Sequence, residues 1–530
     1  MFDLGRTFLQ SVERNPDAPS IVDGEIEWSY AQWFEQIRRT MHLLDHLGIG
    51  RGDKIITVLQ NRWEAATLHW ACQFLAVTIV PLNWRLKAEE LDYSVNDAEA
   101  RAVFYESASE AAVIGSSAAQ AVALIAIDQA KGASLHFDDL LARVRLQDGD
   151  VPMVPTASPD DCSLMLYTSG TTGIGKGVPR RHRHERAAAL AHVAQNLYRN
   201  GERTLGVMPL YHTMGVRSLL AMALVDGLFV CVRRWNVAQA IELVAKYRLS
   251  CLYLVPTLYH DMLAAPGFSA EAVASVGKLG FAGAPMSDGL LKRCAAAFEP
   301  ELFVNHYGSS EVYTFSIEQD APARPGSAGR AGLNTRLRVV TLAAQGPDDL
   351  AGSNEEGQVI VELAGDEAFE GYWKRPDANA KSLRGGWYFT GDTGYINGRG
   401  DLYVTGRMDD MIISGGENIS PVDIESVLSL HPAVDEVAVV GLKDERWGQK
   451  VVAFIRAAKA VDGEELDSYC RSSGLVNFKR PREYVFVEAI PKSPVGKILR
   501  RKLAGGEFVV ANAAAPAAAS AMDTGLATPS

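Results

Sequence analysis

The chain has 530 residues, of which 47% are apolar and 22% are charged, and its formal net charge is −12. The length predicts several domains, and the composition is typical of a globular enzyme. The acidic balance argues against nonspecific nucleic-acid binding, and no apolar run approaches the ~20 residues of a membrane-spanning helix.

Short apolar runs alternate with helix-like segments through the first 335 residues or so. Apolar residues at helical spacing predict helices over residues 187–197 and 237–247. Runs rich in Val, Ile, Leu and Phe predict strands at 55–59, 122–127, 228–232, 251–256, 279–283 and 302–308. This alternation indicates an α/β fold built from layered sheets and helices, with parallel strands.

The pattern changes towards the C-terminus. After about residue 335, strand-like runs separated by glycine-rich turns predict a β-rich subdomain, and from residue 410 a compact α+β unit follows. The glycine-rich, polar junction at 406–418 marks a domain boundary. We therefore expect an N-terminal domain over residues 1–408, a C-terminal domain over 409–504, and an Ala-, Ser- and Pro-rich disordered tail over 505–530.

The stretch YTSGTTGIGKG at 167–177 combines glycines, hydroxyl groups and Lys176, which together suit a polyphosphate. From Gly170 it also matches the first part of a P-loop, G-x-x-x-x-G-K. However, Gly177 occupies the position of the metal-binding Ser or Thr, and Gly177-Val178-Pro179 is a poor helix start. The residues expected to bind ATP phosphates here are Thr168, Ser169, Gly170, Thr171, Thr172, Gly173 and Lys176.

This loop resembles the signature loop of the adenylate-forming superfamily, which contains acyl-CoA synthetases, luciferases and peptide-synthetase adenylation domains. Gly175 stands where that family usually has proline. Further segments resemble family motifs in the same order: MPLYH (208–212), FAGAPM (281–286), NHYGSSE (305–311), GWYFTGD (386–392) and PKSPVGKILRR (491–501). The resemblance covers about residues 5–503. It implies the adenylate-forming enzyme fold with a mobile C-terminal domain.

The resemblance also implies roles for individual residues. Lys497 would be the catalytic lysine, Glu311 the Mg²⁺ ligand, and His212 a catalytic residue that shapes the carboxylate site. Asp409 would be the hinge between the domains. The remaining ATP contacts would be Tyr307 on adenine, Ser310 near the α-phosphate, Asp392 on the ribose, and Arg407 on ribose or phosphates.

Coenzyme A carries a phosphorylated nucleotide, so its site needs cations and an aromatic surface. Candidates for this site are Arg85, Gly415, Gly416, Trp447, Phe478, Arg480 and Arg482. The segments around them resemble bacterial aryl-CoA ligases of the 4-chlorobenzoate type. Positions that line the acyl pocket in that subgroup fall at Ala191, His212, Thr213, Met214, Tyr253, Ala282, His306, Gly308, Tyr313 and Thr314. Most of these residues suit a substrate with a flat ring. His306 and Tyr313 are more polar than a halobenzoate pocket requires, so a hydroxylated aryl acid is a further candidate substrate.

The implied function is an ATP- and Mg²⁺-dependent carboxylate–CoA ligase that forms an acyl-adenylate, then an acyl-CoA, and releases AMP and pyrophosphate. A benzoate-like acid is the first choice of substrate, and a cyclic aliphatic or medium-chain acid is the alternative. An adenylation enzyme that loads a carrier protein would share nearly every motif. A P-loop kinase or GTPase would leave Asp392 and Lys497 without roles, and a nonenzymatic nucleotide sensor would not need Lys497.

The six cysteines are far apart and form no C-x-x-C motif: Cys72, Cys162, Cys231, Cys251, Cys294 and Cys470. We expect reduced, mostly buried thiols; a catalytic cysteine is an alternative that no local signature supports. The N-terminus carries Asp3 and Glu13 in place of a secretory signal. These features predict a cytoplasmic enzyme with small-molecule partners and no nucleic-acid or membrane partner, and they leave a homodimer open.

Overall fold

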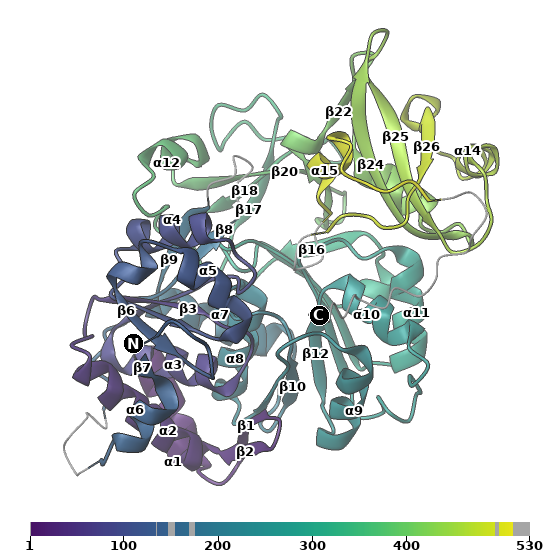
Figure 1. Cartoon of the computed structure of the whole chain (residues 1–530). Coiled ribbons are helices and arrows are strands. Elements are labelled where there is room, and N and C mark those ends of the chain that lie inside the picture. The colour runs from purple at the N-terminus through teal and green to yellow at the C-terminus, as the bar shows by residue number, and fades with distance from the viewer. Residues whose placement is uncertain (1, 134, 147–153, 169–174, 493–497, 512–530) are drawn as a thin grey trace, which may run out of the picture.

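The computed structural model describes residues 2–133, 135–146, 154–168, 175–492 and 498–511. The described residues form three sheets with helices packed around them, which confirms the predicted α/β class (Figure 1). The first sheet lies in the purple-to-blue half of the molecule. The second runs through the teal and green segments, and the third belongs to the yellow-green C-terminal domain at the upper right of that view.

The first sheet has the described strand order β7-β6-β5-β3-β4-β8-β9. All neighbouring pairs are parallel except β8 and β9, which form an antiparallel hairpin at one edge. Its strands are β3 (Lys54–Val58), β4 (Thr78–Pro81), β5 (Ala102–Tyr105), β6 (Ala123–Ala126), β7 (Leu135–His136), β8 (Cys162–Thr168) and β9 (Lys176–Arg181).

The second sheet is long and changes character along its length. A parallel part contains β1 (Pro19–Asp23), β10 (Arg203–Gly206), β11 (Leu228–Cys231), β12 (Cys251–Leu254), β13 (Lys278–Phe281) and β14 (Leu302–Tyr307), with β2 (Ile26–Ser29) antiparallel at its edge. An antiparallel part continues from β14 and contains the predicted β-rich region, although it begins earlier than residue 335, with β15 and β16. Its strands are β15 (Ser316–Glu318), β16 (Ser327–Ala331), β17 (Leu337–Val340), β18 (Gly357–Glu362), β19 (Leu383–Arg384), β20 (Trp387–Ile396) and β21 (Leu402–Arg407).

The third sheet and its two packed helices form the C-terminal domain. Its strands are β22 (Ile412–Ser414), β23 (Glu417–Ile419), β24 (Val434–Asp444), β25 (Gly448–Ala457) and β26 (Glu483–Phe486), with helices α13 (Pro421–Leu428) and α14 (Gly463–Ser472). The short helix α15 (Arg500–Ala504) follows, and η5 is Asn477–Lys479. A single turn, η4 (Met408–Asp410), links β21 to β22, so the predicted boundary at residues 408 and 409 falls in this link.

Helices fill the space around the first two sheets. They are α1 (Leu4–Arg14), α2 (Tyr30–His46), α3 (Trp63–Leu75), α4 (Ala88–Ala98), α5 (Glu110–Gly115), α6 (Phe137–Arg143), α7 (His182–Gln195), α8 (Thr213–Leu224), α9 (Val237–Tyr247), α10 (Pro256–Ala264), α11 (Asp288–Phe298) and α12 (Pro376–Ser382), with turns η1 (Ser107–Ser109), η2 (Ala119–Ala121) and η3 (Ala321–Ala323). Within the described ranges, none of the helices has the length and apolarity needed to cross a membrane.

The largest core cluster joins the two N-terminal sheets. Helices α3 and α8 contribute buried residues along nearly their whole length, which is the pattern of helices enclosed on all sides. Around Phe8, the rings of Trp33 and Trp70 lie 5.2 and 4.8 Å away between ring centroids. Leu219 and Leu220 of α8 belong to the same cluster, so the core holds α8 in place, and its first turn carries Met214 of the predicted acyl pocket.

The predicted tail begins later than the sequence suggested. The expectation of disorder is wrong for residues 505–511, because the backbone N–H of Glu488 donates to Val509 O at 3.0 Å and that of Ala511 donates to Phe486 O at 2.9 Å. The ring of Phe508 also lies 4.9 Å from that of Phe454. Its apolar residues give this stretch a surface to bury, which the Ala-rich remainder lacks. Residues 512–530 lie outside the described residues.

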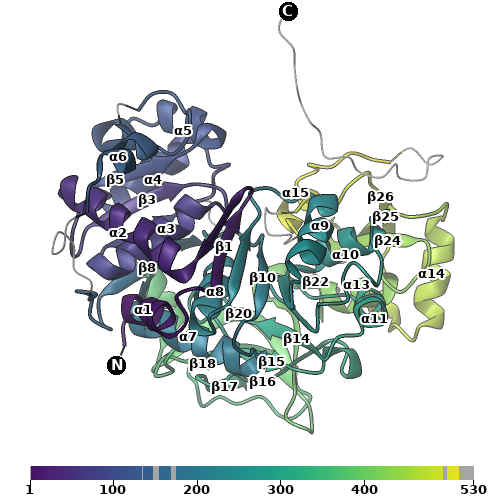
Figure 2. The same cartoon turned by 90° about the horizontal axis from the view of Figure 1, so that it is seen from below.

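An ion pair joins the C-terminal domain to α10 of the N-terminal domain, and Figure 2 shows α10 beside the C-terminal elements. His260 Nε2 lies 2.9 Å from Asp435 Oδ1, and Arg456 Nη2 lies 2.5 Å from Asp435 Oδ2. Hydrogen bonds to Asp261 and Asp435 raise the pKa of His260 to about 9. The hydrogen bond from His260 lowers the pKa of Asp435 to about 2.

We expect this pair to favour the described domain arrangement over a limited pH range. The His260 contribution is complete below its ordinary pKa of 6.5 and is lost as the pH rises through about 9. The Asp435 contribution is present above its ordinary pKa of 3.8 and is lost as the pH falls through about 2. His260→Gln should therefore lower the equilibrium constant for this arrangement by about two- to fivefold at pH 7.

Single-molecule energy transfer between dyes on the two domains would measure this equilibrium. Wild-type protein above pH 9 should resemble the His260→Gln variant at neutral pH, and the variant should show no further change with pH in that range. The exposed His46 provides a control, since His46→Gln should leave the distribution unchanged. Identical distributions for wild type and His260→Gln at neutral pH would contradict a role for the pair.

Candidate active site

The predicted phosphate loop connects two strands, not a strand and a helix. Strand β8 ends at Thr168, β9 begins at Lys176, and these two residues pair in the antiparallel ladder. A Cβ at Gly177 would lie 3.0 Å from Met165 Sδ and 3.2 Å from Trp373 Cβ, so a side chain there would crowd the hairpin. A P-loop continues into a helix after its lysine, so this geometry excludes that alternative. Ser169, Gly170, Thr171, Thr172 and Gly173 lie outside the described residues.

Lys176 and Glu311, far apart in sequence, meet at Tyr372. The Lys176 ammonium lies 4.1 Å from the centroid of the Tyr372 ring, and the Tyr372 hydroxyl donates to Glu311 Oε1 at 2.7 Å. Burial lowers the pKa of Lys176, and the Glu311 charge partly offsets this effect. The hairpin lysine and the predicted metal ligand therefore share one partly buried site, to which Ser310 is adjacent in the chain.

A second group lies where β14, β20 and β21 come together. The Tyr307 hydroxyl donates to Asp392 Oδ2 at 2.6 Å, and Arg407 Nη1 lies 3.3 Å from Asp392 Oδ1. Asp392 and Arg407 are also opposite each other in the β20–β21 register. A carboxylate can accept hydrogen bonds from ribose hydroxyls, and these contacts hold Asp392 in place.

The residues around Glu311 fit a Mg²⁺ ion that also binds a polyphosphate. No group of three or more His, Cys, Asp or Glu side chains suited to a metal occurs in the part of the chain that the structure describes. Mg²⁺ in nucleotide sites uses one or two carboxylates and takes its other ligands from phosphates and water. Glu311, held by Tyr372, can supply that carboxylate, and the ion would neutralise charge on the phosphates.

His212 precedes α8 and is partly buried. Its ring lies 4.7 Å from that of Tyr211. Burial lowers the pKa of His212 to about 4, so the imidazole is neutral near pH 7. It can therefore exchange hydrogen bonds with a carboxylate but does not supply a positive charge there. Its predicted role in shaping the carboxylate site stays a prediction.

The structure brings most of the predicted acyl-pocket residues together. Met214, Tyr253 and Ala282 belong to one apolar cluster, and the Tyr253 ring lies 4.9 Å from that of His306. Ala191, Tyr313 and Thr314 are also buried, whereas Thr213 is only partly buried. Gly308 has to be glycine, because a Cβ there would lie 2.1 Å from Tyr313 O.

Sequence reasoning missed the charged residues behind this pocket. Arg180, Glu185, Arg217 and Glu367 are each at most 2% exposed. Arg180 Nη1 donates to the backbone oxygens of Glu311 and Glu367, so it ties the metal-ligand segment to the pocket. One feature of the sequence could have indicated a buried charge: Arg217 is the only charged residue in the helix TMGVRSLLAMAL.

The candidates for coenzyme A fall in two regions. In the C-terminal domain, the Gly415 N–H donates to Trp447 O at 2.8 Å, and the Arg482 guanidinium lies 5.7 Å from the Trp447 ring. Both Gly415 and Gly416 have positive φ, 61° and 88°, in the β22–β23 turn. Trp447 is 36% exposed and offers a surface for an aromatic base. These residues form one exposed aromatic and cationic group.

The other coenzyme A candidates do not join this group. Arg480 Nη1 donates to both carboxylate oxygens of Asp467, at 2.7 and 2.9 Å, so this cation already has a partner. Phe478 is exposed in η5. Arg85 lies on the N-terminal domain, 3.8 Å from the Trp84 ring, where Arg234 approaches at 4.8 Å. Trp84 with its two arginines is a second aromatic and cationic surface.

The predicted catalytic lysine and hinge lie near the two ends of the C-terminal domain in sequence. Lys497 lies outside the described residues. Lys492 and Ile498, on either side of the segment that contains it, pair as an antiparallel bridge, and Leu499 N donates to Pro491 O at 2.8 Å. Asp409 is exposed in η4, between the second and third sheets. Its role as a hinge stays a prediction.

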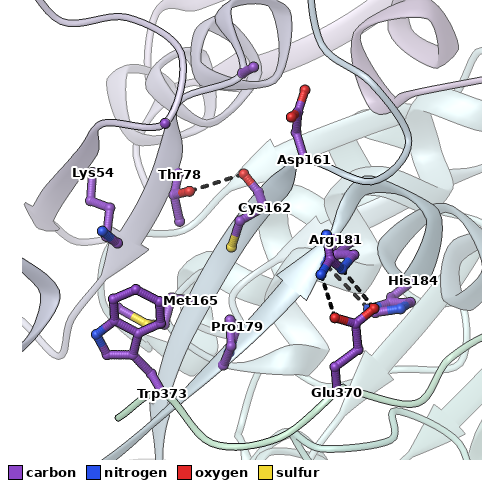
Figure 3. Close-up of a pocket in the computed structure, with 12 residues that line it drawn as sticks. Lys54, Thr78, Asp161, Cys162, Met165, Pro179, Arg181, His184, Glu370 and Trp373 are labelled. Atoms are coloured by element: carbon purple, nitrogen blue, oxygen red, sulfur yellow. Dashed lines mark hydrogen bonds and ion pairs between the residues drawn. The ribbon is translucent and has the colours of Figure 1, made fainter.

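A separate cavity of about 320 Å³ is lined in part by Cys162, Met165, Pro179 and Arg181 of the β8–β9 hairpin (Figure 3). Lys54, Cys162, His184, Glu370 and Trp373 are among its lining residues, and none of the predicted site residues is. Glu370 is bound by Arg181 at 2.8 Å, and His184 accepts from Arg181 N at 3.3 Å. We therefore locate the candidate active site at Glu311 and Asp392 and not at this cavity.

Family comparison agrees with this geometry. The AMP-binding enzyme family matches residues 8–373, and the AMP-binding enzyme C-terminal domain matches residues 423–497. The chain belongs to the AMP-binding enzyme family. A 4-chlorobenzoate–CoA ligase from Arthrobacter sp. is 32% identical over 509 residues, which cover 95% of each chain. The long-chain-fatty-acid–CoA ligase FadD13 of Mycobacterium tuberculosis is also 32% identical, over 95% of this chain and 98% of its own.

Solved structures of this family share the fold. The o-succinylbenzoate CoA synthetase of Bacillus subtilis, in complex with its acyl-adenylate, aligns with a TM-score of 0.80 at 25% identity and covers 94% of this chain and 97% of its own. The anthranilate CoA ligase AuaEII, in complex with anthranoyl-AMP, aligns with a TM-score of 0.86 at 23% identity over 95% and 97%. This AMP-binding enzyme therefore has the adenylate-forming architecture over nearly its whole length.

Proposed function

We propose that this AMP-binding enzyme is an ATP-dependent carboxylate–CoA ligase whose substrate is an aryl acid. The main support is the arrangement of Lys176, Glu311 and Asp392, which suits the phosphates, metal and ribose of one bound ATP. Several relatives that match the chain over most of its length are named CoA ligases for aryl or fatty acids, and one is named a fatty acid–[acyl-carrier-protein] ligase.

In the first step, a carboxylate oxygen of the acid attacks the α-phosphorus of ATP, and pyrophosphate leaves. Both reactants are anions, so the protein has to hold them together and offset their charge. Asp392, fixed by Tyr307 and Arg407, would orient the ribose. Lys176 would neutralise phosphate charge, and Mg²⁺ held at Glu311 would supply further charge neutralisation there.

In the second step, the sulfur of coenzyme A attacks the acyl carbon, the carbon–oxygen bond to AMP breaks, and AMP leaves. Lys497 and the incoming thiol need the same face of the adenylate. Rotation of the C-terminal domain about Asp409 would let one site serve both steps. The exposed group of Gly415, Trp447 and Arg482 would then meet the coenzyme.

An aryl acid fits the residues that converge on the predicted pocket. Tyr253, His192 and His306 place three rings within 5.1 Å of one another between centroids, and Met214 and Ala282 add apolar surface. Flat aromatic side chains stack well on a flat ring. A long alkyl chain would gain less from these aromatic side chains.

The direct test is a substrate panel with product identification. Purified protein is supplied with ATP, Mg²⁺, coenzyme A and one acid at a time: benzoate, hydroxybenzoates, cyclohexanecarboxylate, octanoate or palmitate. AMP, pyrophosphate and an aryl-CoA should form with aryl acids. The kcat/KM for aryl acids should be about tenfold or more above that for aliphatic acids, because an aliphatic acid has no aromatic ring to stack on these side chains.

Other products would redirect the assignment. A clear preference for octanoate or palmitate would overturn the aryl substrate while keeping the ligase. Acid-dependent AMP release that proceeds equally without coenzyme A would point to an enzyme that loads a carrier protein. ADP and orthophosphate would contradict the reaction itself.

A further inference from the structure

Arg217 is a buried cation, and part of its hydrogen-bonding capacity is not used. It lies in the middle of α8, is 2% exposed, and its Nε and Nη2 atoms have no hydrogen-bond partner among the described residues. The nearest carboxylate oxygen, Glu367 Oε2, is 3.9 Å from Nη2, which is beyond hydrogen-bonding distance. Buried guanidinium groups normally donate hydrogen bonds to several acceptors. Two unpaired donors on a buried arginine are therefore unusual, and they indicate that a ligand can supply the acceptor.

Two neutral histidines lie beside this arginine, and one amide fixes their tautomers. Asn196 Nδ2 donates to His192 O at 2.8 Å, which fixes the orientation of the amide. The same Nδ2 lies 3.1 Å from His192 Nδ1, and Asn196 Oδ1 lies 3.1 Å from His306 Nε2. His192 Nδ1 is therefore an acceptor and its Nε2 carries the proton, whereas His306 donates through Nε2.

The free atoms of these rings add to those of Arg217. His192 Nε2 and His306 Nδ1 are buried without a partner in the described residues. Burial lowers the pKa of both rings well below the ordinary value, and the Arg217 charge acts in the same direction. Arg217 and His192 thus present N–H donors, and His306 presents one acceptor.

These residues are at the predicted acyl pocket. The His192 ring lies 4.8 Å from Tyr253 and 5.1 Å from His306, and the Arg217 guanidinium lies 5.3 Å from the Tyr313 ring. Arg217 is also five residues along α8 from His212, or about 7.5 Å along the helix axis. The free donors are therefore separated from the end of the pocket at which the reacting carboxylate is expected.

We propose that Arg217 and His192 select acids that carry an oxygen substituent away from the reacting carboxylate: a hydroxyl, a carbonyl or a second carboxylate. The inference rests on the proposed function and narrows its substrate class. Such an oxygen accepts hydrogen bonds from Arg217 and from His192 Nε2. An aryl acid without such an oxygen would leave these buried donors without partners. The free-energy cost of the unpaired donors makes that acid a poor substrate.

The test compares acids that differ only in this oxygen. Acid-dependent AMP release is measured for benzoate, the three hydroxybenzoates and the three benzenedicarboxylates. We expect at least one oxygen-bearing acid to exceed benzoate in kcat/KM by about 10- to 100-fold, mainly through a lower KM. Comparison of kcat/KM between the hydroxybenzoates and the benzenedicarboxylates shows whether the site prefers a neutral or an anionic substituent.

Variants then assign the preference to Arg217. In Arg217→Met the ratio of kcat/KM for the preferred acid over benzoate should fall by about 10- to 100-fold, and Arg217→Lys should restore part of it. Arg199→Met is the matched control, since Arg199 is 72% exposed and pairs with Glu301, and it should leave the ratio unchanged. Should Arg217→Met fail to fold, His192→Phe should lower the same ratio and also shift the ring substituent accepted.

Wild-type protein alone can refute the inference. Turnover of benzoate or octanoate as good as that of every oxygen-bearing acid would overturn it while leaving the ligase assignment intact. An equal loss for all acids in Arg217→Met would also overturn it, because that is the result of a purely structural role. AMP release with no acid at all would overturn the proposed function and this inference together.

Discussion

Replacing Lys497 by alanine should reduce acyl-adenylate formation by about a hundred- to a thousandfold, as expected for loss of one charged group that stabilises the transition state. In the first step two anions approach, and the lysine would hold the carboxylate and the α-phosphate together. In the second step this charge is not needed, because the acyl-adenylate already exists. Thioester formation from a supplied acyl-adenylate should therefore stay close to the wild-type rate.

The two half-reactions can be measured separately in the full-length protein. Acid-dependent exchange of labelled pyrophosphate into ATP reports the first step, and acyl-CoA formation from synthetic acyl-adenylate reports the second. Lys492→Ala is the matched control, since Lys492 pairs with Glu436 at 2.8 Å in the described arrangement. It should leave the first step within about threefold of wild type. An equal loss of both half-reactions in Lys497→Ala would contradict the use of separate domain orientations.

Arg180→Leu should destabilise the N-terminal domain by about 3–5 kcal/mol, the usual cost of leaving one buried charge uncompensated. Arg180 is fully buried, and its Nε donates to Glu185 Oε1 at 2.8 Å. Its Nη1 donates to the backbone oxygens of Glu311 and Glu367 at 3.0 and 2.6 Å, and the guanidinium lies 4.1 Å from the Tyr313 ring. Leucine would remove these donors from the Glu185 carboxylate and Glu367 O, whereas Glu311 O would keep the hydrogen bond from Phe369 N at 2.9 Å.

Urea unfolding followed by tryptophan fluorescence would measure this loss. Arg181→Leu is the control on the same strand: Arg181 is 38% exposed and pairs with Glu370 at the surface, so its loss should cost about 1 kcal/mol or less. The double variant Arg180→Leu, Glu185→Leu should regain part of the stability, because both partners of the pair are gone. A double variant less stable than Arg180→Leu would show that the pair does not explain the loss.

Local composition was enough to predict much of the molecule. Helix α9 lies at the predicted residues 237–247, and strands form at each apolar run that was assigned to one. The hydroxyl- and glycine-rich loop at 167–177 predicted phosphate chemistry, and Gly177-Val178-Pro179 argued against a following helix. The structure confirms that no helix follows, since Lys176 begins β9, and the phosphate role stays a prediction. Signals of this kind are encoded within a few neighbouring residues, so they are visible without the fold.

The polar interior behind the acyl pocket could not be predicted in this way. Arg180 is in β9, Arg217 in α8 and Glu367 in a loop after β18, and only the fold brings them together. Tyr372 was missed for the same reason, because nothing in its neighbourhood suggests that its hydroxyl reaches Glu311. Residues 505–511 were misjudged because composition over the whole tail hid three apolar residues that find partners on β25, on β26 and just after β26.

The reaction itself can be tested by following one oxygen atom. An aryl acid labelled with heavy oxygen in its carboxylate is converted with ATP and coenzyme A, and the phosphorus products are examined by mass spectrometry. Attack of the carboxylate on the α-phosphorus predicts one labelled oxygen in AMP and none in pyrophosphate. Label in orthophosphate, accompanied by ADP, would mean attack on the γ-phosphorus and would contradict acyl-adenylate formation by this enzyme.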